Sequence, residues 1–230
     1  MRFGFDEVGR GCLAGPVTIC IAGIPHEWPR YTFAHSPDQW SNRMPEWLKK
    51  ARDSKKMSEK IRDDVSMQSL QEPKIFSQLL SASAELIDEW GIGVILSHLL
   101  WLSVQIVAQK NRDVSEYIAD GQITIIEAPD EQLLSCICQE NNLQLWEKMC
   151  WVKIANIVQR ENKADDCYLA VALASTVAKV WRDTEMKKLG IDFPQYGWEQ
   201  NKGYGTLAHR AAITAFGVIS LHRKSWIHGL

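Results

Sequence analysis

The sequence has no excess of basic residues, because 26 Lys and Arg stand against 28 Asp and Glu among 230 residues, a formal net charge of −2. This balance argues against a protein that holds nucleic acid by bulk positive charge, so any such binding must be local. No basic N-terminal segment precedes an apolar stretch, so we expect no secretory signal. The longest apolar run, residues 94–107, contains Ser, His and Gln and is shorter than the roughly 18 apolar residues of a membrane span, so we expect no membrane association.

The six cysteines also form no framework, since they are scattered along a chain long enough to build a core without disulfides. Cys136, Cys138 and Cys150 are close in sequence, but no C-x-x-C spacing and no nearby His completes a tetrahedral zinc set. We interpret them as small buried or half-buried thiols. This use of cysteine is typical of a reducing compartment, and we predict a cytoplasmic location.

Hydrophobic periodicity and turn residues predict an alternating order of strands and helices. Residues 2–8 and 17–24 are apolar runs of strand length, and the Gly-rich turn between them suits a hairpin. Residues 25–52 contain four Pro and mixed charge, as long irregular loops do. Further strands are expected at 74–83, 114–119 and 151–158, and helices at 58–70, 84–90, 92–109, 131–139, 168–188 and 206–216. This order favours an α/β fold with a mixed sheet flanked by helices.

Acidic residues stand where predicted strands end. Asp6 and Glu7 are adjacent in an otherwise apolar strand, where an unpaired buried carboxylate is unfavourable. Because the pleat sends neighbours to opposite faces, both serve one site only if the strand ends or twists at the following Gly-Arg-Gly; otherwise they are solvated acids on an edge strand. Asp120 follows another predicted strand, where open α/β sheets carry site residues. Asp165 lies near the start of a predicted helix, where an acid can also simply favour the helix dipole.

Four carboxylates that converge from these elements repel one another unless divalent cations neutralise them. Oxygen-only ligands select Mg²⁺ or Mn²⁺ over Zn²⁺. Two such ions roughly 4 Å apart are the usual device for in-line hydrolysis of a phosphodiester. The acids therefore indicate a metal-dependent nuclease.

Eight short motifs follow one another along almost the whole chain. They are DEVGRGCLAGPV at 6–17, DSKKMS at 53–58, IADG at 118–121, KAD at 163–165, ASTVAKVWRD at 174–183, FPQYG at 193–197, KGYGT at 202–206 and HRKSW at 222–226. In this order they resemble the signature of ribonuclease HII, the type 2 ribonuclease H. The adjacent Asp-Glu pair distinguishes this type from type 1 enzymes, whose Glu comes from a later helix.

The resemblance implies a ribonuclease H-like mixed five-stranded sheet flanked by helices, with a helical C-terminal portion. The catalytic core would cover residues 1–184, with insertions at about 25–52 and 122–160, and residues 185–230 would form a helical substrate-binding portion. The implied activity is hydrolysis of the RNA strand of RNA–DNA hybrids and incision 5′ to ribonucleotides embedded in duplex DNA. Two Mg²⁺ or Mn²⁺ ions would be bound by the four catalytic acids, Asp6, Glu7, Asp120 and Asp165.

A second group of residues is expected to bind substrate: Gly9, Arg10, Gly11, Lys55, Lys179 and Tyr204. The glycines let the backbone approach a sugar edge, Arg10 can hold a phosphate, and the resemblance places the Tyr204 ring on the deoxyribose that follows the ribonucleotide. Plainer interpretations of these residues are a tight turn, solvated charges and a tyrosine packed on the fold. Further candidate phosphate contacts are Lys56, Arg182, Lys202, Arg223 and Lys224.

Three positions depart from the family's usual residues: Cys12 replaces Pro, Asn201 replaces His and Asp166 replaces Ser. Asp166 adds a negative charge beside the predicted site, which can weaken phosphate approach or alter metal affinity. We interpret Asp183 as a partner of a nearby basic group.

Two alternatives of other kinds stay open at this point. One is a non-catalytic nucleic-acid-binding relative, against which the intact acid set counts. The other is a ribonuclease H-fold DNA endonuclease, against which Tyr204 and the Gly-Arg-Gly loop count. We expect a monomer; a sliding-clamp partner is possible in the family, but the sequence shows no convincing clamp-binding tail.

Overall fold

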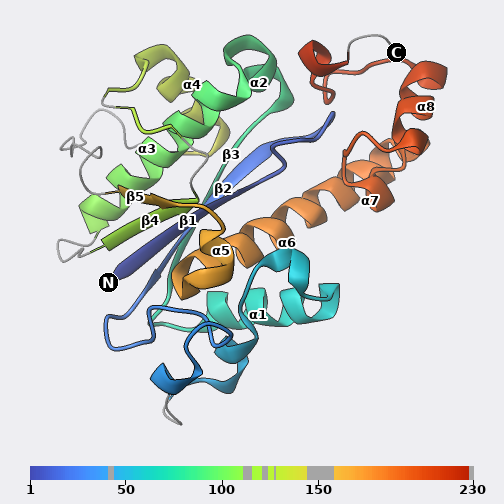
Figure 1. The fold of residues 1–230 in the computed structure, drawn as a ribbon. Coiled ribbons are helices and arrows are strands. Elements are labelled where there is room, and N and C mark those ends of the chain that lie inside the picture. Colours follow the sequence, from blue (N-terminus) through green and yellow to red (C-terminus); the bar gives the residue numbers. More distant parts are fainter. Residues whose placement is uncertain (41–43, 111–115, 121–123, 127, 144–157, 228–230) are drawn as a thin grey trace.

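A five-stranded sheet lies at the centre of the computed structural model, which describes residues 1–40, 44–110, 116–120, 124–126, 128–143 and 158–227 (Figure 1). The strands are β1 (Arg2–Val8), β2 (Val17–Ile24), β3 (Phe76–Ala82), β4 (Glu116–Asp120) and β5 (Val158–Glu161), in the spatial order β3-β2-β1-β4-β5. β2 pairs antiparallel with β1 and β3, whereas β4 runs parallel to β1 and β5 runs parallel to β4. The predicted mixed sheet and its N-terminal hairpin are confirmed.

One face of the sheet is covered by α6 (Leu169–Asp192) and α1 (Glu59–Gln71), as Figure 1 shows. α6 lies so close to β1 that a Cβ atom at Gly4 would stand 2.3 Å from the Val171 backbone nitrogen. Residues of β2 on this face, such as Ala22, are buried against α6. The first insertion packs against the same apolar cluster through Trp28 and Leu48, so it is anchored to the core as well as irregular.

The opposite face is covered by α2 (Ala84–Trp90), α3 (Ile92–Lys110) and α4 (Glu131–Glu140). Phe3 and Phe5 of β1 point to this side and are fully buried with residues of α3 and α4. The apolar run of α3 is longer than the sequence suggested. Residues 92–109 are long and apolar enough by composition to cross a membrane, whereas a run too short for this was expected. In the structure 72% of this segment is buried inside the protein, as a core helix is. Its Ser and His side chains bond back to carbonyls one turn earlier, which lets them lie in an apolar setting.

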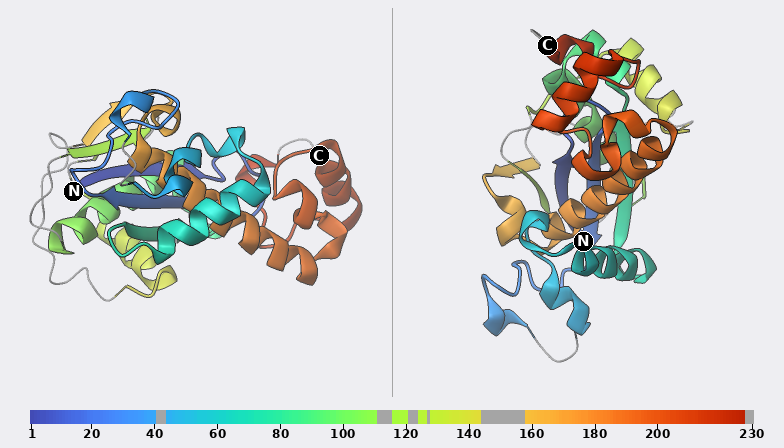
Figure 2. Two further views of the ribbon diagram at one scale, coloured as in Figure 1. Left: turned by 90° about the horizontal axis from the view of Figure 1, so that it is seen from below. Right: turned by 90° about the vertical axis from the view of Figure 1, so that its right-hand side faces the viewer.

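The C-terminal segments gather at one end of the molecule, where α6 leads (Figure 2). They comprise α7 (Trp198–Asn201), α8 (Leu207–Phe216) and the short 3₁₀ helices Pro194–Tyr196 and Lys224–Trp226. Tyr196 and Trp198 stack at 5.1 Å between ring centroids and form the centre of a separate apolar cluster. α6 runs through residue 185 as one helix, and the division of the chain there stays a prediction.

Helix ends follow the signals in the sequence. Ser58 caps α1 by accepting a hydrogen bond from the Ile61 amide, and Thr206 caps α8 by accepting one from the His209 amide. Gly217, at φ +81°, ends α8. The helix expected at 168–188 continues to residue 192, a difference at one end only.

Two parts of the chain differ from expectation or cannot be compared. The strand expected at 151–158 overlaps β5 at Val158 alone, because β5 continues to Glu161 and residues 151–157 lie outside the described part of the chain. α5 (Ala164–Cys167) is a separate helical turn ahead of α6, whereas a single helix from residue 168 was expected. Three further 3₁₀ turns, Pro37–Gln39, Glu46–Lys50 and Ser54–Lys56, interrupt the first insertion and the segment after it.

Candidate active site

A cleft of about 990 Å³ opens where β1 ends beside α5 and α6. Its acidic lining residues come from three separate parts of the sequence: Asp6, Glu7, Asp53, Asp165 and Asp166. Basic and loop residues also line it, among them Gly9, Arg10, Gly11, Lys55, Lys56, Lys179 and Tyr204. The structure thus brings together three of the four predicted catalytic acids and every predicted substrate-binding residue.

Asp6 and Glu7 both line this cleft, although they are neighbours on one strand. β1 ends at Val8, and Gly9 turns the chain with φ +88°, so the alternation of the pleat stops there. The Arg10 guanidinium lies 3.7 Å from the Glu7 carboxylate. Both acids were expected to share one site only if the strand ended or twisted directly after them. The strand does end there.

Asp165 reaches the cleft from the first turn of α5. Lys163 precedes this turn in a left-handed conformation, φ 58°, and starts the helix abruptly after β5. The neighbouring Asp166 also lines the cleft, where its carboxylate accepts a hydrogen bond of 2.7 Å from Lys56. α5 therefore presents two adjacent acids, of which Asp166 has a lysine partner.

Asp120 is placed by the sheet register. Ala119 of β4 pairs with Phe5 of the parallel β1, so Asp120 and Asp6 are the next residues along the two strands. Parallel strands bring their carboxyl ends to one edge, and the Asp120 backbone lies there. The structure describes this backbone and not the side chain.

The donor atoms of the site fit a hard divalent cation. Asp6, Glu7 and Asp165 offer only carboxylate oxygens, which suit Mg²⁺ or Mn²⁺ better than zinc. Within the described side chains, no three His, Cys, Asp or Glu groups are gathered closely enough to hold a metal by themselves. The fourth predicted ligand, Asp120, is described by its backbone alone, so its part in binding a metal stays a prediction.

Lysines line the same cleft as the acids. Lys179 of α6 pairs with Asp183 at 2.8 Å, which confirms that Asp183 partners a basic group. The Lys179 ammonium also lies 5.8 Å from the centroid of the Tyr204 ring. Burial raises the pKa of the Tyr204 hydroxyl, so this side chain is a neutral amphipathic surface beside the lysine.

Arg182 and Arg223 are not phosphate contacts, which corrects the expectation from the sequence. Both guanidinium groups are fully buried and donate to backbone carbonyls within the fold. The charges of the ASTVAKVWRD and HRKSW motifs suggested phosphate binding. In the folded protein, however, the side chains of Arg182 and Arg223 are enclosed by other segments. Of the remaining candidates, the Lys202 ammonium donates to the Glu199 carbonyl, and Lys224 is exposed away from the cleft lining.

Gly9 and Gly11 of the Gly-Arg-Gly loop are glycines for different structural reasons. A Cβ at Gly9 would stand 2.2 Å from Arg182 Nε, so this glycine is required by its positive φ and by Arg182 packed beneath it. The predicted close approach to a sugar does not explain Gly9. A Cβ at Gly11 would meet no atom within 4 Å, and Gly11 is exposed in the cleft. Gly11 therefore leaves open space for a ligand.

Two of the departures take part in the walls of the site. Asn201 holds the turn before Tyr204, because its side chain donates to the Tyr196 carbonyl at 2.7 Å and accepts from the Gly203 amide at 2.8 Å. Cys12 is buried and forms a β-bridge with Tyr204. Sequence reasoning gave no role to Asn162 and Ser175, which also line the cleft; their adjacency to the KAD and ASTVAKVWRD motifs was the available signal.

Comparison with known proteins agrees with this geometry. The family model of Ribonuclease HII matches residues 41–228. The ribonuclease HII of Flavobacterium psychrophilum is 31% identical over 98% of this chain and 90% of its own, and that of Porphyromonas gingivalis is 32% identical over 97% and 87%. The chain belongs to the ribonuclease HII family. It is a metal-dependent endoribonuclease of the ribonuclease H2 type, as the motifs predicted.

Solved ribonuclease H structures share the fold. A PCNA:RNase HII complex from Archaeoglobus fulgidus has a TM-score of 0.65 at 24% identity, covering 98% of this chain and 93% of that chain. The ribonuclease H2 of Pyrococcus horikoshii has a TM-score of 0.60 at 21% identity, covering 97% and 92%. Bst-RNase HIII in complex with Mn²⁺ has a TM-score of 0.61 at 16% identity, covering 97% and 66%. The similarity to these structures shows the fold alone. The dependence of this chain on a divalent cation follows from its membership of the ribonuclease HII family.

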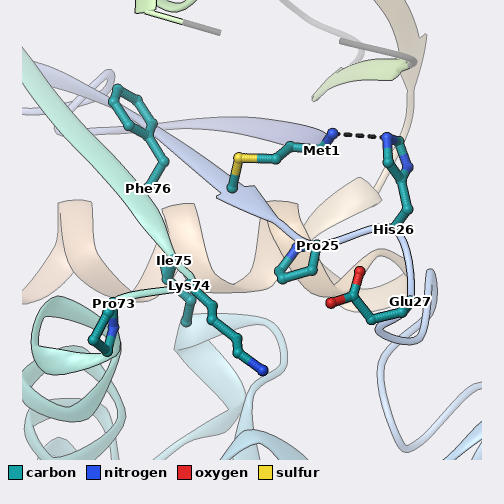
Figure 3. Close-up of a pocket in the computed structure, with 8 residues that line it drawn as sticks. All are labelled: Met1, Pro25, His26, Glu27, Pro73, Lys74, Ile75 and Phe76. Carbon is teal, nitrogen blue, oxygen red and sulfur yellow. Dashed lines mark hydrogen bonds between the residues drawn. The ribbon is translucent and has the colours of Figure 1, made fainter. Parts of the chain in front are cut away.

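A second hollow of about 530 Å³ lies at the opposite end of the sheet, where β1 and β3 begin and β2 ends (Figure 3). Figure 3 shows the N-terminal amine of Met1 directed toward His26, at 2.7 Å from its Nε2 atom. Phe76 and Ile75 supply apolar walls. At about 3.3 Å per strand residue, this hollow is roughly 20 Å from Glu7, and it takes no part in the acidic cleft.

Proposed function

We propose that this ribonuclease HII hydrolyses the RNA strand of RNA–DNA hybrids and incises 5′ to single ribonucleotides in duplex DNA, with two Mg²⁺ or Mn²⁺ ions held by Asp6, Glu7, Asp120 and Asp165. One observation carries the proposal: the Asp6, Glu7 and Asp165 side chains share a cleft with an open Gly11 and the Tyr204 ring. A plain DNA nuclease needs the acids but has no use for a surface that reads a sugar.

The ions, when bound, would supply Lewis acidity and an activated water for in-line attack on the phosphorus. The chain's part is to bind and orient. Asp6 and Asp165 approach from a strand end and a helix start, two rigid supports that fix their carboxylates relative to each other. Lys55 and Lys179, on the walls of the cleft, attract the phosphate backbone without reading its sequence.

Discrimination of RNA from DNA at one nucleotide depends on a single group, the 2′-hydroxyl. Gly11 offers an exposed backbone with no side chain in the way. Tyr204, 38% exposed, offers a ring against which a sugar lacking that hydroxyl can pack. We infer that these two groups read adjacent sugars.

The test is incubation with Mg²⁺ or Mn²⁺ and a DNA duplex that carries one ribonucleotide, beside an all-DNA duplex of the same sequence. The expected result is incision 5′ to the ribonucleotide by the wild type, no incision by Asp6→Asn, and no incision of the all-DNA duplex. Equal cutting of both duplexes would favour the DNA endonuclease, and no cutting by the wild type would favour the non-catalytic relative.

A further inference from the structure

Two buried arginines lie directly beneath the loops that form the walls of the cleft. Arg182 comes from α6 and Arg223 from the segment after α8, and both are fully buried. Within the described part of the chain, no carboxylate forms an ion pair with either guanidinium within 4 Å. A buried cation that forms no direct ion pair must be stabilised by hydrogen bonds, so the atoms it bonds are held firmly.

Arg182 joins the two walls to each other. Its Nε donates to the Pro16 carbonyl at 2.9 Å and its Nη2 to the Ala14 carbonyl at 3.1 Å, at the outgoing end of the Gly-Arg-Gly loop. Its Nη1 donates to the Lys202 carbonyl at 2.9 Å, in the turn that carries Tyr204. One rigid, planar group thereby fixes the separation of these two segments.

Arg223 closes the loop on itself. Its Nη1 donates to the Arg10 carbonyl at 3.0 Å, and its Nη2 and Nε donate to the Gly15 carbonyl at 3.0 and 3.2 Å. The Arg223 amide also donates to the Leu13 carbonyl at 2.8 Å. The beginning and the end of the loop are therefore bound to the same side chain.

The bond to Arg10 decides where the next amide points. In a trans peptide the carbonyl and the following N–H point in opposite directions. Because Arg223 binds the Arg10 carbonyl from inside, the N–H of Gly11 faces away from Arg223, and Gly11 lies exposed in the cleft. The buried guanidinium thus aims a backbone donor at the space in which a sugar would lie.

We propose that Arg182 and Arg223 are positioning residues, which hold the Gly11 amide and the Tyr204 ring at a fixed spacing and so set the preference for a ribonucleotide. This inference rests on the proposed function. Lysine cannot replace either arginine, because a single ammonium lacks the planar fork that reaches several carbonyls at once. The role differs from phosphate binding, since neither guanidinium reaches the cleft.

The test measures binding to two duplexes, one with a single ribonucleotide and one all DNA, by fluorescence anisotropy with the full chain. Asp6→Asn is the parent in which cleavage is blocked, and Arg223→Lys and Arg182→Lys are added to it separately. Asn141→Ala is the matched control, because the Asn141 side chain makes two hydrogen bonds to Ser81 of β3 and one to Ile137 of α4, away from the cleft. Thermal unfolding of every variant reports on the fold.

The parent is expected to prefer the ribonucleotide duplex, and each arginine variant to lose about tenfold of that preference, the size of one lost hydrogen bond. Affinity for the all-DNA duplex stays within about twofold in each arginine variant, because the lysines that hold phosphates are untouched. Asn141→Ala keeps the parent's preference even if its unfolding temperature falls. An arginine variant that folds and keeps the preference for the ribonucleotide duplex overturns the positioning role. If one variant does not fold, the other still provides the test. A parent that binds both duplexes equally overturns the proposed substrate and this assignment together.

Discussion

The Lys56 ammonium lies 2.7 Å from the Asp166 carboxylate at the edge of the acidic cleft. The hydrogen bond that Lys56 donates to Asp166 raises the pKa of Lys56, so the lysine stays charged while it is engaged. Lys56 belongs to the DSKKMS motif, and Asp166 directly follows the KAD motif. One of the cleft lysines is therefore held by the acid that directly follows the predicted metal ligand Asp165.

Replacing this acid is expected to strengthen substrate binding. Asp166→Ser frees Lys56 for a phosphate, so we expect a KM roughly three- to tenfold lower at low salt and a salt slope steeper by about one. Lys56→Met tests the cause: it changes little in the wild type but removes the gain in Asp166→Ser. A higher requirement for metal in Asp166→Ser, with no change in the salt slope, would show instead that Asp166 acts through the cations.

Replacing each of the two adjacent acids of α5 is expected to have very different effects on activity. Asp165→Asn is expected to lower kcat about a thousandfold, since it removes a charged ligand worth several kcal/mol in the transition state. Asp166→Asn, its matched control on the same helical turn, retains a kcat near that of the wild type, although its KM also falls because it frees Lys56. Single-turnover cleavage of the ribonucleotide duplex over a range of Mg²⁺ concentrations measures both. Equal losses in the two variants would contradict the assignment of Asp165.

Local patterns were enough to predict the parts of the site that depend on sequence order. The apolar runs at 2–8 and 17–24 predicted both β1 and β2, and the unusual position of Asp6 and Glu7 at a strand end marked the site. The KAD motif placed Asp165 correctly at a helix start, although α5 as a separate turn was not expected. In each case the signal lay within a few residues.

The surroundings of the site depend on contacts between distant segments, which no local pattern contains. Arg182 bonds Pro16 and Arg223 bonds Arg10, pairs separated by 166 and 213 residues. An arginine in a polar motif is usually exposed, so its charge alone predicts a surface role. The need for glycine at position 9 could not be predicted from the sequence either, because the atom that excludes a Cβ there belongs to the distant Arg182.

The contact between β1 and α6 predicts a large effect on stability. At Gly4 a Cβ would stand 2.3 Å from the Val171 nitrogen and 2.4 Å from the Ala170 carbonyl carbon, and backbone atoms cannot rotate away. Gly4→Ala is therefore expected to lower the free energy of unfolding by about 3 kcal/mol. Gly93→Ala in α3 is the control, since a Cβ there meets nothing within 4 Å and alanine favours a helix by up to about 1 kcal/mol. Urea unfolding of both variants decides, and equal stabilities would contradict the close packing.

The histidines of the C-terminal cluster predict a loss of stability in mild acid. His222 is fully buried against Tyr196 and His209, with ring centroids 4.7 and 5.5 Å away. Burial, together with the nearby His209, lowers the pKa of His222 to about 4, and burial lowers the pKa of His209 as well.

In the unfolded chain a histidine titrates near pH 6.5, so between that pH and about 4 the unfolded state binds more protons than the folded state. The contribution of His222 to stability is complete above pH 6.5 and is lost as the pH falls, by about 1 kcal/mol for each pH unit. Urea unfolding at pH 7.5, 6.5 and 5.5 measures this slope. His222→Asn is less stable than the wild type at pH 7.5, because it loses packing against Tyr196, but the gap narrows at pH 5.5, since asparagine takes up no proton. A gap that stays constant over this range would mean that His222 titrates alike in both states, and the cluster would then be held by packing alone.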